Sequence, residues 1–199
     1  MGKIVITSNT TVDGVVQDPD GAEGFEHGGW FHQAATPADL AAWAARETQE
    51  ALAAEALLLG RRSSEWFESR TPQFGARVSH DWAERMNSLP KYVVSSTLQQ
   101  PRWHNTTVLN GDAAKEISEL KRRIDGEILV YGSYQLARTL IAENLADELR
   151  LVVFPIAVGT GLRLFDQSSE RTPLHLVDTR QLSAGLVFHT YEFAHDHRS

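Results

Sequence analysis

Residues Glu127–Phe165 read EILVYGSYQLARTLIAENLADELRLVVFPIAVGTGLRLF, and this stretch carries the clearest pattern of strands and a helix in the chain. It opens on a short apolar run with β-branched residues, which predicts a strand at Ile128–Tyr131. Leu136 and Leu140 then recur at helical spacing, and a second apolar strand is expected at Leu149–Phe154. The order strand, helix, strand is typical of an α/β sheet.

Gly132 and Ser133 stand where the first of these strands passes into the helix. Glycine lets the backbone approach a ligand closely, and the free N–H groups of the first helical turn can hold an anion such as a pyrophosphate. Glycine at such a turn also meets purely steric needs. Ligand binding and a tight turn are therefore both open at this point.

The composition and charge of the chain limit which classes of protein it can belong to. With 199 residues, 42% of them hydrophobic, the chain can bury a core, and we expect a single domain over residues 1–199. The formal net charge of −7 argues against a nucleic-acid partner. The chain has no cysteine, which excludes disulfides and thiolate metal sites and suits a reducing compartment. Because we find neither a signal-peptide pattern nor an apolar run of membrane-spanning length, we expect a cytoplasmic protein without a membrane partner.

Strand and helix patterns alternate along most of the chain. Before the opening stretch, strands are expected at Lys3–Thr7, Leu57–Leu59, Tyr92–Val94 and Thr106–Leu109, and helices at Thr36–Ala54 and Asp112–Arg123. A hairpin-like pair closes the chain at Leu174–Ser183 and Leu186–Phe193. This order predicts an α/β fold with a central, mostly parallel sheet, an antiparallel C-terminal edge and flanking helices.

Two further segments carry local signals. Residues Ser8–Gly29 are rich in Gly, Asp, Asn and Pro, and a long segment of this kind after a core strand is expected to be functional. After the second strand, Ser63 or Ser64 is suited to cap a helix.

Polar or glycine-rich residues follow three of the predicted strands. Ligands in an open α/β sheet bind beyond the carboxyl ends of its strands. We therefore predict one ligand-binding cleft formed by Gly60–Ser63, Ser95–Thr97 and Gly132–Ser133.

These strand exits resemble the dihydrofolate reductase fold, as do the TVDG of Thr11–Gly14 and the later DELRL and GTGLRLF runs. The chain is most similar to the branch that contains the reductase domain of riboflavin biosynthesis, the RibD C-terminal domain, and its stand-alone bacterial relatives. The resemblance covers nearly the whole chain. It implies an NADPH-dependent oxidoreductase acting on a small heterocycle, pterin-like or pyrimidine-like, and a homodimer that pairs near Leu162, Leu164 and Phe165.

The resemblance also implies which residues hold the cofactor. The turn after the second strand would bind its phosphates, and the exit of the next strand would contact the adenosine ribose and its 2′-phosphate. Relatives often carry an arginine where Ser96 stands, and Arg61 or Arg62 could supply the missing charge by a bidentate contact. The Gly-Gly pair of the wider family is Gly132-Ser133 here. The implied set is Gly60, Arg61, Arg62, Ser63, Ser95, Ser96, Thr97, Gly132, Ser133, Tyr134, Gln135 and Leu136.

On the substrate side, Asp13 matches an acidic position of the riboflavin-type branch, which implies that it orients substrate or relays a proton. An Asx turn before Gly14 explains the same residue equally well. Phe25 and Trp30 are expected either to wall the substrate pocket or to pack in the core. Asp39, in the first turn of its helix, is expected to interact with the helix dipole.

Other chemistries lack their motifs. His27 and His32 have no third ligand at a suitable spacing, so no metal site is expected. The sequence lacks the GxGxxG of a Rossmann domain, a Walker GxxxxGK[ST] and a GxSxG elbow. His189 is expected on an edge strand, and His195 and His197 in a tail without a site.

The leading hypothesis is an NADPH-dependent reductase that transfers hydride to a small heterocycle. A second hypothesis is a non-catalytic module on the same fold that binds a nucleotide or a flavin-like ligand. A third is a dimeric scaffold with no ligand, for which Arg61→Ala would change no ligand affinity.

Overall fold

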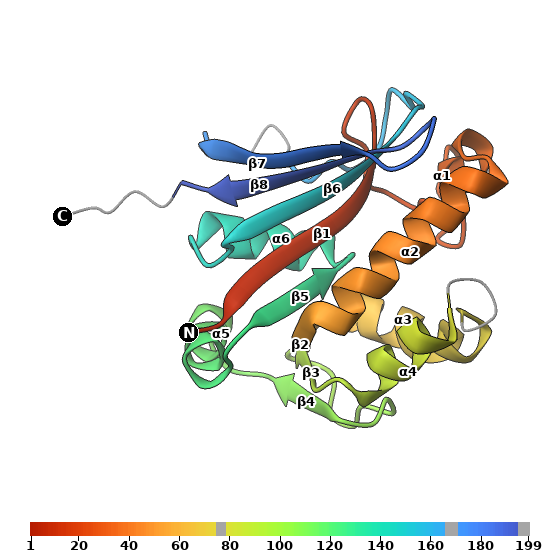
Figure 1. Cartoon of the computed structure of the whole chain (residues 1–199). Coiled ribbons are helices and arrows are strands. Elements are labelled where there is room, and N and C mark those ends of the chain that lie inside the picture. Colours follow the sequence, from red (N-terminus) through yellow and green to blue (C-terminus); the bar gives the residue numbers. More distant parts are fainter. Residues whose placement is uncertain (75–78, 166–170, 195–199) are drawn as a thin grey trace. The chain divides into compact units, whose positions relative to one another are not determined.

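The computed structural model describes residues 1–74, 79–165 and 171–194. These residues contain an eight-stranded sheet with the strand order β4-β3-β2-β5-β1-β6-β8-β7 (Figure 1). The strands are β1 (Lys3–Thr11), β2 (Ala54–Gly60), β3 (Lys91–Val94), β4 (Thr106–Leu109), β5 (Glu127–Tyr131), β6 (Glu148–Phe154), β7 (Leu174–Gln181) and β8 (Val187–Phe193). The helices are α1 (Trp30–Ala34), α2 (Pro37–Ala53), α3 (Arg61–Phe74), α4 (His80–Ser88), α5 (Ala113–Arg123) and α6 (Tyr134–Ala142).

The chain forms two compact units. The first combines Met1–Ile6 with Ala44–Asp147, and the second combines Thr7–Trp43 with Glu148–Ser199. Strand β1 and helix α2 each contribute residues to both units. The single domain expected over residues 1–199 stays a prediction.

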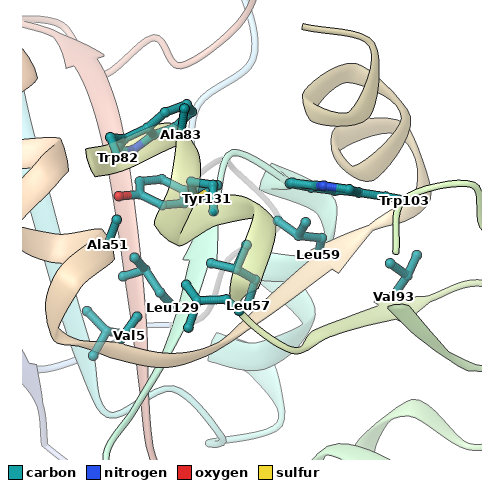
Figure 2. Packing of buried hydrophobic residues seen from close by; sticks show 13 residues of the cluster. Val5, Ala51, Leu57, Leu59, Trp82, Ala83, Val93, Trp103, Leu129 and Tyr131 are labelled. Atoms are coloured by element: carbon teal, nitrogen blue, oxygen red, sulfur yellow. The ribbon is translucent and has the colours of Figure 1, made fainter. Parts of the chain in front are cut away.

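The first unit is built on parallel strands. β2 pairs in parallel with both β3 and β5, and β3 pairs in parallel with β4. Residues Ala56 to Leu59 of β2 are completely buried, as expected for the interior of a parallel sheet covered on both faces. The core of this unit includes Trp82, Trp103 and Tyr131, which lie over the aliphatic side chains of the strands (Figure 2).

The second unit is antiparallel. β8 pairs with β6 on one side and with β7 on the other, so β7 forms the edge predicted for the C-terminal pair. Its core joins α1 to β6: the ring of Trp30 meets Phe154 edge-on at 5.5 Å, and Phe31 lies 4.8 Å from the same ring. Together the parallel pairs and the antiparallel edge confirm the predicted α/β class.

Most predicted elements are confirmed with small shifts at their ends. The helix expected from Asp112 begins at Ala113, because the Asp112 carboxylate caps it by accepting from the Lys115 amide at 2.9 Å. The first strand is longer than predicted and reaches Thr11. The additional residues are the polar SNTT of Ser8–Thr11, which the prediction places in the turn-rich segment although threonine is a good strand former.

Two local predictions need correction. Helix α3 begins directly at Arg61, so Ser63 and Ser64 lie inside its first turn and neither is the N-cap. Helix α4 was not predicted; Ser79 caps it by accepting from the Trp82 amide at 3.0 Å. No helix in the described part of the chain is long and apolar enough to cross a membrane. His195 and His197 lie outside the described residues.

Candidate functional site

The three predicted strand exits lie at one edge of the first unit. Gly60, the last residue of β2, is in register with Val94, the last residue of β3. β5, which ends at Tyr131, runs parallel to β2 on its other side. The segments beginning at Arg61, Ser95 and Gly132 therefore leave the sheet in the same direction from neighbouring strands.

Gly132 and Ser133 make a left-handed turn between β5 and α6. Their φ angles are 54° and 52°, a region that glycine enters freely and serine rarely. A Cβ on Gly132 would lie 3.4 Å from the Ser63 Oγ. The backbone conformation therefore favours glycine here, whereas a Cβ would meet Ser63 at an ordinary contact distance.

Reciprocal hydrogen bonds hold Ser133. Its amide donates to the Ser63 Oγ at 3.0 Å, and its own Oγ accepts from the Gly60 amide at 3.0 Å. Ser133 occupies the N-cap position of α6 but makes no capping bond to that helix. Since the Ser133 side chain leaves the first-turn amides of α6 uncapped, these amides could hold an anion.

Two cations stand at the start of α3. Arg61 and Arg62 are both exposed. Arg61 Nη1 lies 3.5 Å from the Glu65 carboxylate, a long pair between half-exposed side chains. Surface pairs of this type contribute little, so a phosphate could displace Glu65 at small cost.

The exit of β3 is a tight serine turn. Ser95 Oγ accepts from the amides of Thr97 at 3.2 Å and Leu98 at 3.0 Å. Ser96 and Thr97 are exposed. Because its hydroxyl shapes the turn, Ser95 would act through the backbone, while Ser96 and Thr97 present their side chains to solvent.

In the first turn of α6, Tyr134 is half-buried and Gln135 is exposed. The Leu136 side chain is only 7% exposed. Leu136 could therefore contribute to a ligand site only through its backbone, whereas Gln135 has a free side chain face.

An aromatic cluster that the sequence analysis did not assign to the site lies in the core of the first unit. Phe67 of α3 is centred 6.3 Å from Trp103, 5.9 Å from Tyr131 and 6.4 Å from Trp82. Burial raises the pKa of Tyr131 well above its ordinary value, so its hydroxyl stays neutral. Figure 2 shows Trp82, Trp103 and Tyr131 within this cluster. The only indication of this cluster in the sequence is that each of these segments contains an aromatic residue.

Asp13 belongs to the second unit, and its carboxylate is heavily hydrogen-bonded. It accepts from Thr11 Oγ1 at 2.6 Å and from the amides of Val158 at 3.1 Å and Gly159 at 2.7 Å. The Nε of Arg163 donates to the Asp13 backbone carbonyl at 2.9 Å. The bonds to the carboxylate, the one from Thr11 first, lower the pKa of Asp13 to about 2. The carboxylate is ionised at neutral pH and fixes the loop after β6. The expected Asx turn is not formed, because the Val15 amide donates to Thr11 Oγ1 at 2.9 Å instead. A catalytic role for Asp13 stays a prediction.

The two aromatic candidates for the substrate side differ in burial. Trp30 is 1% exposed, packs in the core of the second unit and donates from Nε1 to the Gln17 carbonyl at 2.9 Å. This burial favours the core-packing alternative for Trp30. Phe25 is half-buried beside Gly161, where a Cβ would lie 3.2 Å from its ring, and it meets His27 edge-on at 5.6 Å. A substrate role for Phe25 stays a prediction.

Asp18 is a structural residue that the sequence analysis missed. It is 2% exposed, and its carboxylate accepts from the amides of Glu23 and Phe25, each at 2.9 Å. A Cβ on Gly28 would lie 2.4 Å from that carboxylate. Asp18 therefore organises the turn-rich segment and holds Phe25 in place. No group of His, Asp or Glu in the described ranges could hold a metal ion.

With the geometry in hand, comparison with known proteins identifies the family. The RibD C-terminal domain model matches residues 2–188. The chain belongs to the RibD C-terminal domain family. This RibD C-terminal domain is 29% identical over 140 residues to the uncharacterized protein YyaP of Bacillus subtilis (strain 168), covering 70% of this chain and 74% of YyaP. It is 24% identical over 135 residues to YwjB of the same organism, covering 68% of this chain and 72% of YwjB.

Solved structures share the fold of this RibD C-terminal domain. A putative riboflavin biosynthesis protein from Shewanella sp. PV-4 superposes with a TM-score of 0.72 at 18% identity, covering 97% of this chain and 99% of that one. A pyrimidine reductase-like protein from Corynebacterium diphtheriae gives 0.57 at 14%, covering 98% and 92%. A diaminohydroxyphosphoribosylaminopyrimidine deaminase/5-amino-6-(5-phosphoribosylamino)uracil reductase from Thermotoga maritima gives 0.63 at 13%, covering 97% of this chain and 57% of the enzyme.

Proposed function

We propose that this RibD C-terminal domain is an NADPH-dependent reductase of a pyrimidine-like or pterin-like heterocycle. The observation that carries the proposal is the reciprocal bonding of Ser133 with Ser63 and Gly60, which joins the starts of α3 and α6. Membership of the RibD C-terminal family supports a reductase role. The solved relatives that are named as pyrimidine or uracil reductases support the substrate class.

NADPH, when bound, supplies the hydride. The protein therefore has to bind and orient the cofactor and the substrate, and to exclude water from the site. We assign its pyrophosphate to the backbone amides at the starts of α3 and α6, including Tyr134–Leu136, while the Gly60 amide, which donates to the Ser133 Oγ, would hold the turn in place. The exposed Arg61 and Arg62 would provide the charge for the 2′-phosphate, with Ser96 and Thr97 at the ribose.

For the substrate side we propose Asp13 and Phe25. An ionised Asp13 cannot donate a proton at neutral pH, so we propose that it orients substrate and fixes the 158–163 loop. Trp30 would contribute by packing, since its indole Nε1 holds the Gln17 carbonyl.

Titration with NADPH, followed by tryptophan fluorescence, tests the cofactor assignment. The rings of Trp82 and Trp103 are centred 6.4 Å and 6.3 Å from the ring of Phe67 on α3. A ligand at the start of that helix should therefore change their fluorescence emission. We expect saturation at micromolar NADPH and weaker binding of NADH. The absence of a saturable change up to millimolar NADPH would contradict the proposal. The titration is repeated with Arg62→Ala, and its matched control is Arg123→Ala, which removes an exposed cation of α5.

A non-catalytic module that binds a nucleotide or flavin-like ligand is the second candidate. The observation that favours it is the Asp13 carboxylate, whose hydrogen bonds are all satisfied within the chain. The two functions separate in an NADPH-oxidation screen against pterins and pyrimidines. A reductase loses turnover in Asp13→Asn while keeping NADPH affinity, whereas a binding module oxidises no NADPH with any of these compounds.

We also propose that the protein is a homodimer. Of the apolar residues expected at the interface, Leu164 is 5% exposed and already packed within its own chain, while Leu162 and Phe165 are half-buried. Light scattering after size-exclusion chromatography tests the assembly; a mass of 22.2 kDa at all concentrations would mean a monomer.

A further inference from the structure

Lys91, the first residue of β3, has a completely buried side chain. Its Nζ donates to the carbonyl oxygens of Asn87 and Leu89, both at 2.8 Å, and lies 4.4 Å from the centre of the Trp103 ring. Helix α4 ends at Ser88, so these carbonyls are at its C-terminus, where a cation is favoured. The face of an indole attracts a cation as well.

This position is expensive for an ammonium group. Burial alone lowers the pKa of Lys91 to about 8, and no carboxylate within the described ranges pairs with its Nζ. The nearest cation of α4, Arg85, donates instead to the carbonyls of Ala51 and Ala54. An apolar side chain of similar length would avoid the desolvation penalty. A side chain that breaks a local rule in this way marks a functional or positioning role.

The contacts of Lys91 fasten the end of the segment between β3 and β4. Trp103, under the ammonium group, donates from Nε1 to the Asn87 Oδ1 at 3.0 Å. Asn105 donates from Nδ2 to the Ser88 carbonyl at 3.1 Å and accepts from the Lys91 amide at 2.8 Å. The Lys91 ammonium group, the Trp103 indole and the end of α4 are therefore connected in one group of contacts.

The same segment begins with the Ser95 turn. Leu98, whose amide donates to the Ser95 Oγ at 3.0 Å, packs against the hydrophobic cluster that contains Trp103. Phe67 of α3 stacks on Trp103 at 6.3 Å. A displacement of Trp103 would loosen the packing of Leu98 and with it the turn.

We propose that Lys91 is a positioning residue that, by holding Trp103 against the end of α4, orders the turn Ser95–Thr97. The proposal rests on the proposed function in one respect, the assignment of that turn to the adenosine end of NADPH.

The test compares Lys91→Met with Lys115→Met, an exposed lysine on α5. Three quantities are measured: the unfolding temperature, amide hydrogen exchange at Thr97 and Leu98 in the free protein, and the Kd for NADPH. For Lys91→Met we expect an unfolding temperature close to that of the wild type, because the loss of the hydrogen bonds to the Asn87 and Leu89 carbonyls offsets the relief of desolvation. We also expect exchange at the two amides to be about tenfold faster and NADPH binding to be about fivefold weaker. Lys115→Met should match the wild type throughout.

Unchanged exchange at Thr97 and Leu98 would overturn the proposal, as would a lower unfolding temperature with faster exchange across the whole first unit. If Lys91→Met fails to fold, Trp103→Leu serves instead. It removes the indole ring that the Lys91 ammonium group contacts, and it should give the same local increase in exchange. If the wild type does not bind NADPH, the proposed function fails, and the exchange experiment still decides the role of Lys91.

Discussion

The backbone amide of Ser133 donates to the side-chain oxygen of Ser63 at 3.0 Å, across the gap between two neighbouring strand exits. The Ser133 hydroxyl returns a bond by accepting from the Gly60 amide at 3.0 Å. The Ser133 backbone therefore ties the start of α6 to α3, and its side chain ties it to the end of β2. The geometry of the two helix starts is set by side chains before any ligand arrives, which reduces the entropy lost on binding.

Ser133→Ala should weaken this connection. It leaves the Gly60 amide without its acceptor, and we expect a loss of about 1 kcal/mol in the free energy of unfolding and several-fold weaker NADPH binding. Denaturant unfolding and fluorescence titration measure the two effects. The control is Ser69→Ala, whose hydroxyl donates to the Trp66 carbonyl on an exposed part of α3; an equal loss of affinity in both variants would argue against the role of Ser133.

Removing the cations of α3 should change cofactor preference. Arg61→Ala and Arg62→Ala remove exposed charges at the start of the helix. If they bind the 2′-phosphate, NADPH affinity falls about tenfold for the residue in contact, while NADH affinity changes little. Kd values for both cofactors at low and high salt check this. Equal losses for NADPH and NADH would assign the arginines to the pyrophosphate instead.

Asp13 should make stability depend on pH in the acid range. Its folded pKa is about 2 against an ordinary value of 3.8, so its contribution is complete above pH 3.8 and is lost as the pH falls toward 2. Asp13→Asn should lower the free energy of unfolding at pH 7 by roughly 1–3 kcal/mol. It should also flatten the dependence between pH 4 and 2. Denaturant unfolding across this range is the measurement, and an unchanged pH profile would show that the bonds to Val158 and Gly159 contribute nothing.

The start of α2 should depend on a capping pair. Thr36 accepts from the Asp39 amide at 3.3 Å, and Thr36 Oγ1 donates back to the Asp39 carboxylate at 2.7 Å. Thr36→Ala should reduce the free energy of unfolding by about 1 kcal/mol, whereas Thr36→Ser should retain most of it. Hydrogen bonds from Ser183 and Thr36 hold the pKa of Asp39 well below its usual range, so the pair should survive at mildly acidic pH. Equal stability of both variants would contradict this assignment.

Most helices and strands could be located from the sequence, because the residue patterns that indicate them extend over only a few neighbouring positions. The apolar run at Ile128–Tyr131 and the helical spacing of Leu136 and Leu140 correspond to β5 and α6. Asp39 was placed correctly in the first turn of α2, but its contacts were not foreseen. Its carboxylate also accepts from Ser183 Oγ and from the Gly185 amide at 3.1 Å. These partners lie more than 140 residues away, which no spacing rule reaches.

The sequence alone determined the α/β class, the order of the elements and the three polar strand exits, because periodicity and turn residues act over a few positions. Only the tertiary structure decided how those exits are joined and which polar groups are already satisfied. The bond of Ser133 to Ser63 and the bonds of Asp13 to the loop after β6 join residues that are far apart in the sequence. Such contacts depend on packing in three dimensions, and packing is fixed by the whole chain at once.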